Sequence, residues 1–407
     1  MIEPKEALRI ILDEVKLQSV EKVNLMDSLG YVLAEDVFSD MDIPPFDNSA
    51  MDGFAIIASD TVGSLRESPK KLTVLGSLRA GDVSNVKVVS GSALKIMTGA
   101  PTPAGADAVV KKEDTFLNDN EVSVLSEIKK GENIRLAGED MIKGEKVLSI
   151  GTCLKPQQIG LFASLGKSKV KVFKTPTVAI ISTGDELVEI DESLKPGKIR
   201  NSNTYSLTAQ VMLCGANPLS LGIARDNVAD TKKKIELGLD NSDVLLTTGG
   251  VSMGDYDVVK DVLGDLGAEL KFWKVAQKPG MPLAFWRLDD KLIFGLPGNP
   301  VSTMVCFEEY VRPAVLKMMG RKLIFRSEVN AVFEHDLKKK SGRVFFVRVN
   351  VRRKNGEFYV SLTGPQGSGI LKSMSLADGI AVIPSDKTLI KTGDKVKVHL
   401  VNLPEDH

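Results

Sequence analysis

The stretch that most constrains the fold of this chain is a short apolar run that breaks into glycines and then into carboxylates. Val244 to Leu246 has the composition of a buried strand, and Gly249-Gly250 lets the backbone turn sharply and approach a ligand closely. Asp255 and Asp257 follow the turn. Ligands of open α/β sheets bind outside the carboxyl ends of the strands, so the pattern suggests a loop that handles anions and metals. Taken alone, it is more typical of an ordinary strand-to-helix turn with an acidic helix start.

The residues that follow Thr177 alternate between strand-like and helix-like patterns. This alternation predicts a parallel sheet with helices on both faces. Asn203 is expected to cap one helix and Gly215 to end it, and Asn299 is expected to cap a helix over 300–318 that starts with Pro300. The apolar runs typical of strands are 178–182, 218–222 and 244–246, and the runs with helical spacing are 203–214 and 228–239.

The rest of the chain divides into smaller modules. Pro4 opens an amphipathic helix, strand-like runs follow at 20–25 and 32–38, and short alternating runs between 55 and 135 predict an all-β module. A helix at 156–165 and a strand at 169–173 return the chain to its first module, and the residues from Leu323 onwards predict a small closed β-barrel. The expected fold class is α/β plus all-β modules, in domains at 1–45 with 141–175, 46–140, 176–322 and 323–407.

Composition narrows the chemistry. Lysine plus arginine equals aspartate plus glutamate at 53 each, so no global field favours nucleic acid or an anionic membrane. Three scattered cysteines fit buried thiols in a reducing compartment, and three late histidines leave little material for a histidine triad or a zinc site. The N-terminus lacks a signal-peptide pattern and no apolar run reaches the ~20 residues of a membrane span, which predicts a cytoplasmic protein.

Three predicted strand ends carry the groups that an anion and a metal need. They lie at 182–186, 247–257 and 295–302, and the third opens into a helix whose amides and dipole favour phosphate. Glu186, Asp255 and Asp257, with Asp226 between them in the sequence, supply carboxylate oxygens. Mg²⁺ needs only one or two of these because it keeps waters and phosphate oxygens as its other ligands. Two further strand ends with this chemistry favour a binding site over an ordinary turn.

Cations and turns elsewhere add to this picture. Most lysines are solvated surface charges, but Pro279 and Gly280 fix the backbone after Lys278 and favour its contact with an oxyanion. Arg348 lies on a predicted strand, and the turn at 364–369 can present Ser368. The Asp-rich loop at 43–55 and the turn that carries Thr98 have the same ambiguity, because all of these patterns are also typical of purely structural residues.

The order of the motifs resembles that of one family, the MoeA molybdopterin molybdenumtransferases, which the E domain of gephyrin also represents. The resemblance covers essentially the whole chain and rests on PPFDNSAMDGFA, IMTGAPTP, NIRLAGED, STGDEL, RNSN, TTGGVSMGDYD, KPGMP, GLPGNPVS and GPQGSG. It implies an elongated, four-domain homodimer. In that arrangement the MogA-like, molybdopterin-binding α/β domain of one subunit faces the β-rich domain of the other.

The resemblance also implies an activity in molybdenum cofactor biosynthesis: insertion of molybdate into adenylylated molybdopterin, with Mg²⁺-dependent release of AMP. It further implies transient contact with molybdopterin adenylyltransferase. Asp52, Thr98 and Asp140 would come from one subunit. The other subunit would contribute Glu186, Asp226 and Asp257 as carboxylates for Mg²⁺, Lys274 and Lys278 as catalytic lysines, and, as further binding residues, Asp243, Thr248, Gly249, Gly250, Ser252, Gly298, Asn299, Pro300, Ser302, Arg348 and Ser368. Lys278, Ser302, Arg348 and Ser368 would form the molybdate seat.

Departures from the family pattern are modest. Phe54 stands where relatives usually have tyrosine, and Pro365 and Gly369 stand where relatives often have histidine. The substitutions in the barrel turn bear on the details of the molybdate seat.

Three other functions remain open at this stage. A tungsten-inserting homologue has the same pattern, since molybdate and tungstate share size and charge. A non-catalytic scaffold of the same fold could lose its acidic residues, but Asp52, Asp140, Glu186, Asp226 and Asp257 are all present. An adenylyltransferase that acts through the TTGG module alone would not need the additional β modules or the KPGMP and GPQGSG loops.

Overall fold

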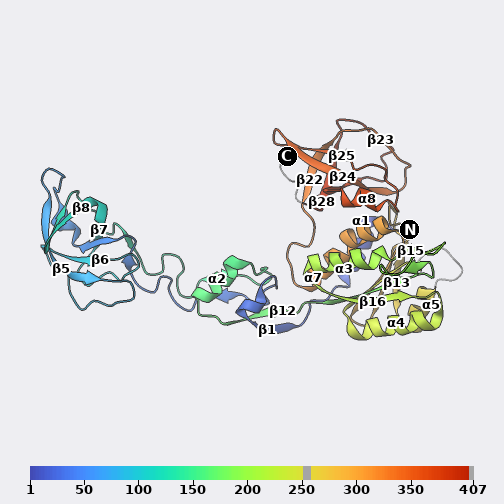
Figure 1. Cartoon of the computed structure of the whole chain (residues 1–407), viewed down its shortest axis with the longest axis horizontal. Coiled ribbons are helices and arrows are strands. Elements are labelled where there is room, and N and C mark those ends of the chain that lie inside the picture. Colours follow the sequence, from blue (N-terminus) through green and yellow to red (C-terminus); the bar gives the residue numbers. More distant parts are fainter. Residues whose placement is uncertain (251–257, 403–407) are drawn as a thin grey trace. The chain divides into compact units, whose positions relative to one another are not determined.

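The computed structural model describes residues 1–250 and 258–402 of the chain. These residues form two compact units (Figure 1). One unit comprises residues 1–35, 151–160 and 168–407, and the other comprises residues 36–150 and 161–167. The division into four domains stays a prediction.

A six-stranded sheet forms the core of the unit around residues 36–150. Its order is β7-β4-β6-β5-β9-β8; β5 and β6 run parallel and the other neighbours antiparallel. Gly53 has to be glycine, because a Cβ there would lie 1.9 Å from the carbonyl oxygen of Val110. The strands confirm the predicted all-β module and are β4 (Gly53–Ile56), β5 (Lys70–Leu78), β6 (Ser92–Ile96), β7 (Ala108–Lys111), β8 (Thr115–Asn118) and β9 (Glu121–Val124).

Short ladders and helical turns complete this unit. β2 (Val37–Phe38) pairs with β11 (Lys146–Leu148), and β3 (Asn48–Ser49) pairs with β10 (Ile134–Arg135). The short 3-10 turns are η2 (Ala58–Thr61) and η3 (Lys112–Asp114).

The chain returns to its first module as predicted. β1 (Val20–Asn24) pairs antiparallel with β12 (Lys169–Phe173), next to the 3-10 turn η1 (Leu25–Ser28). The predicted strand at 32–38 is only partly correct, because Val32 and Leu33 form single bridges and regular pairing starts with β2. The predicted helix at 156–165 is α2 (Pro156–Ser164). Of the three free cysteines, Cys214 and Cys306 are buried as expected, whereas Cys153 is only half-buried.

A mixed six-stranded sheet forms the centre of the α/β region. Its order is β16-β13-β17-β21-β20-β18, and the first four strands run parallel, whereas β20 and β18 run antiparallel to their neighbours. The expectation of a parallel sheet was therefore wrong for β20, which alone runs opposite to the other five strands and makes both of its pairings antiparallel. Asp289 and Asp290 form a two-residue turn between β20 and β21, and such a turn can join only antiparallel strands. The strands are β13 (Thr177–Thr183), β16 (Asn217–Ala224), β17 (Val244–Thr248), β18 (Glu269–Trp273), β20 (Ala284–Leu288) and β21 (Lys291–Leu296).

Helices cover both faces of this sheet, as predicted. α4 (Val228–Asn241) and α5 (Val258–Asp265) pack on one face, and α3 (Ser202–Cys214) packs on the other together with the helical segment from Pro300 to Met318. Asn201 caps α3 by accepting a hydrogen bond from Thr204 N, so the cap predicted at Asn203 was wrong; Gly215 ends the helix in the left-handed conformation. Within the described ranges, no helix has the length and apolarity needed to cross a membrane.

The segment predicted as one helix over 300–318 has three parts. α6 (Pro300–Cys306) passes through a π-helical turn (Phe307–Val311) into α7 (Arg312–Met318). Pro313 explains the interruption, since it has no amide to bond to the Glu309 carbonyl four residues earlier. Pro300 occupies the first turn as predicted, but the side chain of Asn299 makes no capping hydrogen bond.

The C-terminal strands close into the predicted small barrel. The closed order is β24-β25-β22-β28-β26 and back to β24, and β19 (Gln277–Lys278) from the α/β region adds to β24. Apolar side chains fill the barrel, and a second cluster joins its outer face to α6 and α8 (Leu371–Ser375). The barrel strands are β22 (Glu328–Phe333), β24 (Val344–Lys354), β25 (Glu357–Leu362), β26 (Gly379–Ile383) and β28 (Lys395–Leu400); shorter pairs are β14 (Leu187–Val188) with β15 (Ile199–Arg200), and β23 (Leu337–Lys338) with β27 (Leu389–Ile390).

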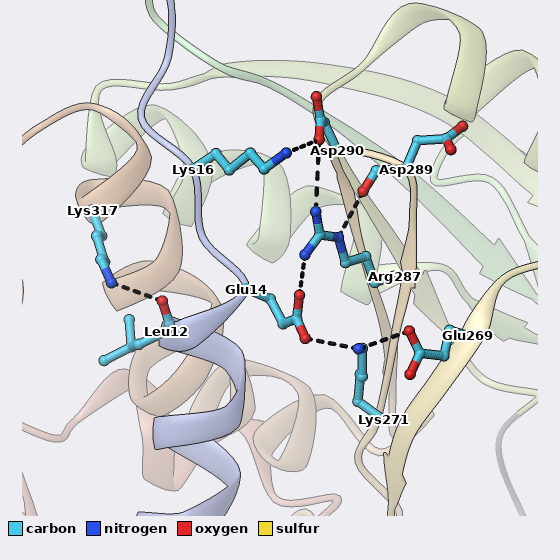
Figure 2. A network of polar contacts seen from close by, with 9 residues as sticks. All are labelled: Leu12, Glu14, Lys16, Glu269, Lys271, Arg287, Asp289, Asp290 and Lys317. Atoms are coloured by element: carbon cyan, nitrogen blue, oxygen red, sulfur yellow. Dashed lines mark hydrogen bonds and ion pairs between the residues drawn. The ribbon is translucent and has the colours of Figure 1, made fainter.

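Helix α1 (Pro4–Asp13) is fastened to the edge of the α/β sheet by a polar network (Figure 2). Glu14, just after the helix, binds Lys271 at 2.8 Å and also pairs with Arg287, from β18 and β20 respectively. The hydrogen bonds from Lys271 and Arg287 lower the pKa of Glu14 despite its burial. Ala7 and Ile11 add apolar contacts with the core. The N-terminal helix is thus an integral part of the α/β region.

Candidate active site

The three strand ends singled out in the sequence lie side by side. β13, β17 and β21 are parallel neighbours, and their register pairs Ser182 with Thr248 and Thr248 with Leu296. Their carboxyl ends therefore meet at one edge of the sheet, and the loops that follow face a common space.

One side of this edge holds a cavity with two carboxylates. The cavity has a volume of about 380 Å³. Glu186 and Asp226 line it together with Gly249 and Gly250, so the structure brings these four predicted residues together. Thr183, Gly184, Thr231, Val258 and Val259 complete the lining.

The two carboxylates are held by local geometry. Gly184 has φ +143°, and a Cβ on it would lie 2.4 Å from the Glu186 carboxylate, so the side chain of Glu186 folds back over a position that only glycine leaves open. Asp226 accepts a hydrogen bond from Asp185 N at 3.2 Å, and Asp185 accepts one from Asp226 N at the same distance. This reciprocal pair ties the loop after β13 to the loop after β16. Asp185 was not assigned a role from the sequence, although it stands beside Glu186 in the same motif.

The donor set of the cavity fits Mg²⁺. In the part of the chain that the structure describes, no group of three or more His, Cys, Asp or Glu residues could hold a metal by itself. Mg²⁺ does not need such a group, since one or two carboxylates suffice when waters and phosphate oxygens complete the coordination. Ser252, Asp255 and Asp257, expected to contribute here, lie outside the described residues.

Asn203 connects two glycine-containing loops on the other side of the same edge. Its side-chain amide donates to Thr248 Oγ1 at 2.7 Å and to the carbonyl of Gly298 at 2.8 Å. Thr248 in turn donates to the carbonyl of Pro297 at 3.1 Å. Asn203 therefore fixes the TTGG loop against the GLPGNP loop, a role that the sequence misassigned to helix capping. The capping pattern of Asn201 and Asn203 is locally the same, and only the tertiary fold distinguishes them.

The start of α6 meets the barrel. The amide of Val301 donates to the carbonyl of Ser368 at 3.1 Å, and the Oδ1 atom of Asn299 lies 3.9 Å from the Cβ position of Gly369. The expectation that this helix start offers its amides to an anion was therefore wrong for Val301, because the barrel loop already occupies that donor. Ser302 is buried, and its carbonyl oxygen lies 3.5 Å from the Cβ position of Gly280. Gly298, Asn299, Pro300 and Ser302 are thus brought next to the KPGMP and GPQGSG loops.

Lys278 stands exposed at the junction of the α/β region and the barrel. It pairs with Phe345 in the β19–β24 ladder, and its Nζ atom lies 5.2 Å from the centre of the Phe345 ring. The Nζ atom of Lys339 lies 4.9 Å from the same ring. Beneath the loop, the side chain of the fully buried Gln277 donates to the carbonyl of Gly280 at 3.2 Å and accepts from the hydroxyl of Tyr310. These hydrogen bonds thus hold the backbone of the loop that carries Lys278.

Two other predicted residues lie at opposite edges of the sheet: Lys274 follows Trp273, which is in register with Gly295 through Ala284 at the carboxyl edge, whereas Asp243 lies at the other edge. Asp243 precedes β17, at the opposite end of the strand from Gly249, and its carboxylate accepts a hydrogen bond from Thr177 N at 2.7 Å. The structure therefore gives Asp243 a role in joining strands, and the expectation that it binds the cofactor is wrong for this reason. Lys274 has φ +71°, and its Nζ atom lies 4.1 Å from the centre of the Trp273 ring.

Arg348 is almost fully buried, with 1% of its surface exposed. Its guanidinium donates to the carbonyls of Pro365 at 3.2 Å and Gly367 at 3.0 Å and to Ser373 Oγ at 3.0 Å. Burial lowers the pKa of Arg348 to about 10, so the group remains protonated at neutral pH. The expectation that Arg348 contacts the oxyanion directly is not supported, because its donors are engaged by the loop that carries Ser368.

In the unit around residues 36–150, Asp52 and Thr98 form a pair. The amide and the hydroxyl of Thr98 both donate to Asp52 Oδ1, at 2.8 and 2.7 Å, and these hydrogen bonds lower the pKa of Asp52. Asp140 lies exposed on a separate turn, where its amide donates to the carbonyl of Ile43. Phe54 is buried in the core of the sheet.

Comparison with known proteins covers nearly the whole chain. Residues 2–166 match the MoeA N-terminal region (domain I and II), residues 179–317 match a probable molybdopterin binding domain, and residues 330–401 match the MoeA C-terminal region (domain IV). The chain belongs to the MoeA family.

Relatives named molybdopterin molybdenumtransferase support this assignment. The protein of Staphylococcus epidermidis is 36% identical over 400 residues, which cover 98% of this chain and 95% of the relative. That of Haemophilus influenzae is 36% identical over 385 residues, which cover 94% of each chain. The crystal structure of the molybdopterin biosynthesis MoeA protein from Pyrococcus horikoshii superposes with a TM-score of 0.83 at 33% identity and covers 98% of this chain and 100% of that one. The chain is thus a member of a transferase family of molybdenum cofactor biosynthesis.

Proposed function

We propose that this protein inserts molybdate into adenylylated molybdopterin and releases AMP in a Mg²⁺-dependent reaction. The observation that carries the proposal is that one sheet edge presents two different sets of side chains. Two carboxylates line a cavity on one side, and a lysine, a buried arginine and the start of α6 lie around the loops on the other side. The proposed reaction needs both environments close together. One would bind the phosphate linkage between molybdopterin and AMP, and the other would bind the molybdate oxyanion.

Glu186 and Asp226 would hold Mg²⁺. When bound, the ion neutralises the pyrophosphate of the substrate and makes its phosphorus more electrophilic. Gly249 and Gly250 both adopt positive φ, and a Cβ on either would crowd Thr183, at 2.6 and 3.0 Å, so glycine is needed for the loop to pack where it lines the cavity. Asp185 keeps Asp226 oriented through their reciprocal hydrogen bonds.

Lys278 supplies positive charge for molybdate and for the developing negative charge on the departing AMP. Ser368, on the loop bound to Arg348, completes the proposed seat. We further propose that a molybdate oxygen attacks the phosphorus of the AMP group, so that the P–O bond to the molybdopterin phosphate breaks. The dithiolene sulfurs of molybdopterin then displace this oxygen from molybdenum, so that the Mo–O bond breaks and AMP leaves with the new oxygen. With ¹⁸O-labelled molybdate, the label would then appear in AMP, and its absence there would reject this step.

The active protein would be a homodimer in which Asp52, Thr98 and Asp140 of one subunit serve the site built around Glu186 and Asp226 of the other. The exposed Asp52–Thr98 pair supports this assignment, because the hydrogen bonds from Thr98 and the charge of Lys112 lower the pKa of Asp52 and keep an accessible carboxylate ionised. A transient complex with molybdopterin adenylyltransferase would deliver the adenylylated substrate.

The function is tested by following AMP release from adenylylated molybdopterin in the presence of molybdate and Mg²⁺. The wild-type protein should release AMP only when both ions are present and should restore an apo-molybdoenzyme. Asp226→Asn should lower the rate at least about 100-fold, since it removes a carboxylate from the proposed Mg²⁺ site. Asp240→Asn makes the same change of charge at an exposed position of α4 and should leave the rate unchanged.

Two other outcomes would redirect the assignment. Release of AMP with tungstate but not with molybdate would identify a tungsten-inserting homologue. Binding of the substrate without any release, for both oxyanions, would reject the enzymatic proposal and favour a scaffold.

A further inference from the structure

The loop 364–369 is wrapped around a single residue of the barrel. Arg348 donates its guanidinium hydrogens to the carbonyls of Pro365, Gln366 and Gly367. The main chain of Arg348 is held as well, because Gln366 Oε1 accepts from Arg348 N at 2.9 Å and Gln366 Nε2 donates to Arg348 O at 3.1 Å. Both the side chain and the backbone of one residue thus determine the path of the loop.

Gln366 continues the β-ladder with its side chain. Backbone pairing between β24 and β25 runs from Lys354–Glu357 to Val349–Leu362, and Arg348 is the next residue of β24. There the side-chain amide of Gln366 bonds both the N–H and the carbonyl of Arg348, and it shares the carbonyl with the amide of Thr363, the residue after β25, which donates at 3.4 Å. Gln366 Nε2 also donates to the carbonyl of Gly364 at 3.1 Å, which closes the loop on itself.

The loop held in this way is in direct contact with the candidate site. The carbonyl of Ser368 accepts from Val301 N at the start of α6, and Gly369 lies against Asn299. A shift of Gln366 would therefore move Ser368 relative to the GLPGNP loop. The guanidinium of Arg348 meets only carbonyls and the hydroxyl of Ser373 in this network, so its charge is not cancelled by a carboxylate there.

We propose that Gln366 is a positioning residue for oxyanion binding: it sets the Ser368 loop against α6 so that the loop, backed by the charge of Arg348, accepts a tetrahedral dianion such as molybdate. The inference rests on the proposed function. It assigns to Gln366 an effect on oxyanion affinity without direct contact.

The test compares Gln366→Met, which keeps the length of the side chain and removes its hydrogen bonds, with wild type in the AMP-release assay at varied molybdate. The KM for molybdate should rise about tenfold, as for residues that orient a ligand's direct contacts, while kcat stays within about twofold. Gln366→Glu should raise the KM further, because it also places a negative charge beside Arg348. Ser375→Ala, on the exposed side of α8, should change neither value.

A second measurement does not depend on turnover. Equilibrium dialysis of the full-length proteins with molybdate alone should give a weaker Kd for Gln366→Met than for wild type, at equal folded fraction by circular dichroism. A variant with lower thermal stability but unchanged KM and Kd would show a purely structural role and overturn the inference. Wild-type protein that releases AMP independently of molybdate would instead reject the proposed function, and the inference would fall with it.

Discussion

Two glycines at the sheet edge determine where neighbouring residues of the candidate site lie, because they have no side chain. Glu186 folds over Gly184, and Gly280 allows the KPGMP loop to lie against Cys306, whose Sγ would be 2.4 Å from a Cβ at that position. In both cases an added methyl group would displace a residue or loop of the candidate site without touching a ligand.

Gly184→Ala should therefore weaken Mg²⁺ binding. The Cβ would collide with the Glu186 carboxylate, and φ +143° is strained for alanine, with an expected cost of about 1–3 kcal/mol in the free energy of unfolding. Half-maximal AMP release should require more Mg²⁺, and urea unfolding should report the loss of stability. Gly264→Ala, in open space on α5, serves as the control and should be neutral or slightly stabilising. An unchanged Mg²⁺ requirement for Gly184→Ala would mean that Glu186 is not held by this contact.

Sequence patterns correctly predicted which residues meet at the sheet edge, but they did not predict all of the hydrogen-bond partners there. Glu186, Asp226, Gly249 and Gly250 could be predicted to meet because they follow parallel strands. The role of Asn203 could not, since its partners Thr248 and Gly298 are 45 and 95 residues away. The engagement of Arg348 likewise depends on a loop whose conformation is set by tertiary hydrogen bonds.

At the scale of elements, the barrel is joined to the π-helical turn by an ion pair. His399 Nδ1 of β28 lies 3.0 Å from Glu309 Oε1, and its Nε2 lies 3.7 Å from Glu328 Oε2 of β22. Burial lowers the pKa of His399 and Lys397 acts in the same direction, but the hydrogen bond and charge of Glu309 and the charge of Glu328 outweigh them, so the pKa lies above its ordinary value.

This pair should make stability depend on pH. A histidine with a raised pKa in the folded state stabilises fully below its unfolded pKa of about 6.5, and this contribution is lost as the pH rises through the folded pKa. His399→Gln should cost roughly 0.5–1 kcal/mol near pH 6 and progressively less towards pH 9, as measured by urea unfolding. His335→Gln, at an exposed position, should show no such trend. A penalty for His399→Gln that is constant over this range would contradict the assignment.

Element types were more predictable than their pairing. The alternation of apolar residues correctly predicted the C-terminal barrel and the all-β module, but it did not single out β4, β8 or β22. The reversed direction of β20 was missed, because the turn Asp289-Asp290 lacks the glycine that usually marks a hairpin, although Asp289 adopts φ +50°. The interruption of the helix over 300–318 was not predicted, because Pro313 was included in one continuous helix.

At the scale of the whole molecule, the proposal of a shared site predicts a particular result for mixed dimers. If Asp52 and Asp226 of one site come from different subunits, a dimer of Asp52→Ala with Asp226→Ala has one doubly altered site and one intact site. Mixed dimers of the two inactive variants should then show about half of the wild-type rate, because each has one working site out of two. The rate is measured after co-expression and purification with two different affinity tags.

Absence of complementation in verified mixed dimers would place Asp52 and Asp226 in the same subunit or remove Asp52 from the site. Each variant alone, mixed with wild type, provides the control for normal assembly.

The fastening of α1 has a consequence for the order of events during synthesis. Glu14 leaves the ribosome early, but 273 residues separate it from Arg287, its partner on the sheet edge. At roughly 5–20 residues per second, the helix waits about 14–55 s for that partner, with Ala7 and Ile11 still uncovered. The unit around residues 36–150 is complete long before then. The nascent chain therefore carries a complete β unit while the segment that forms α1 still lacks its partners on the sheet edge.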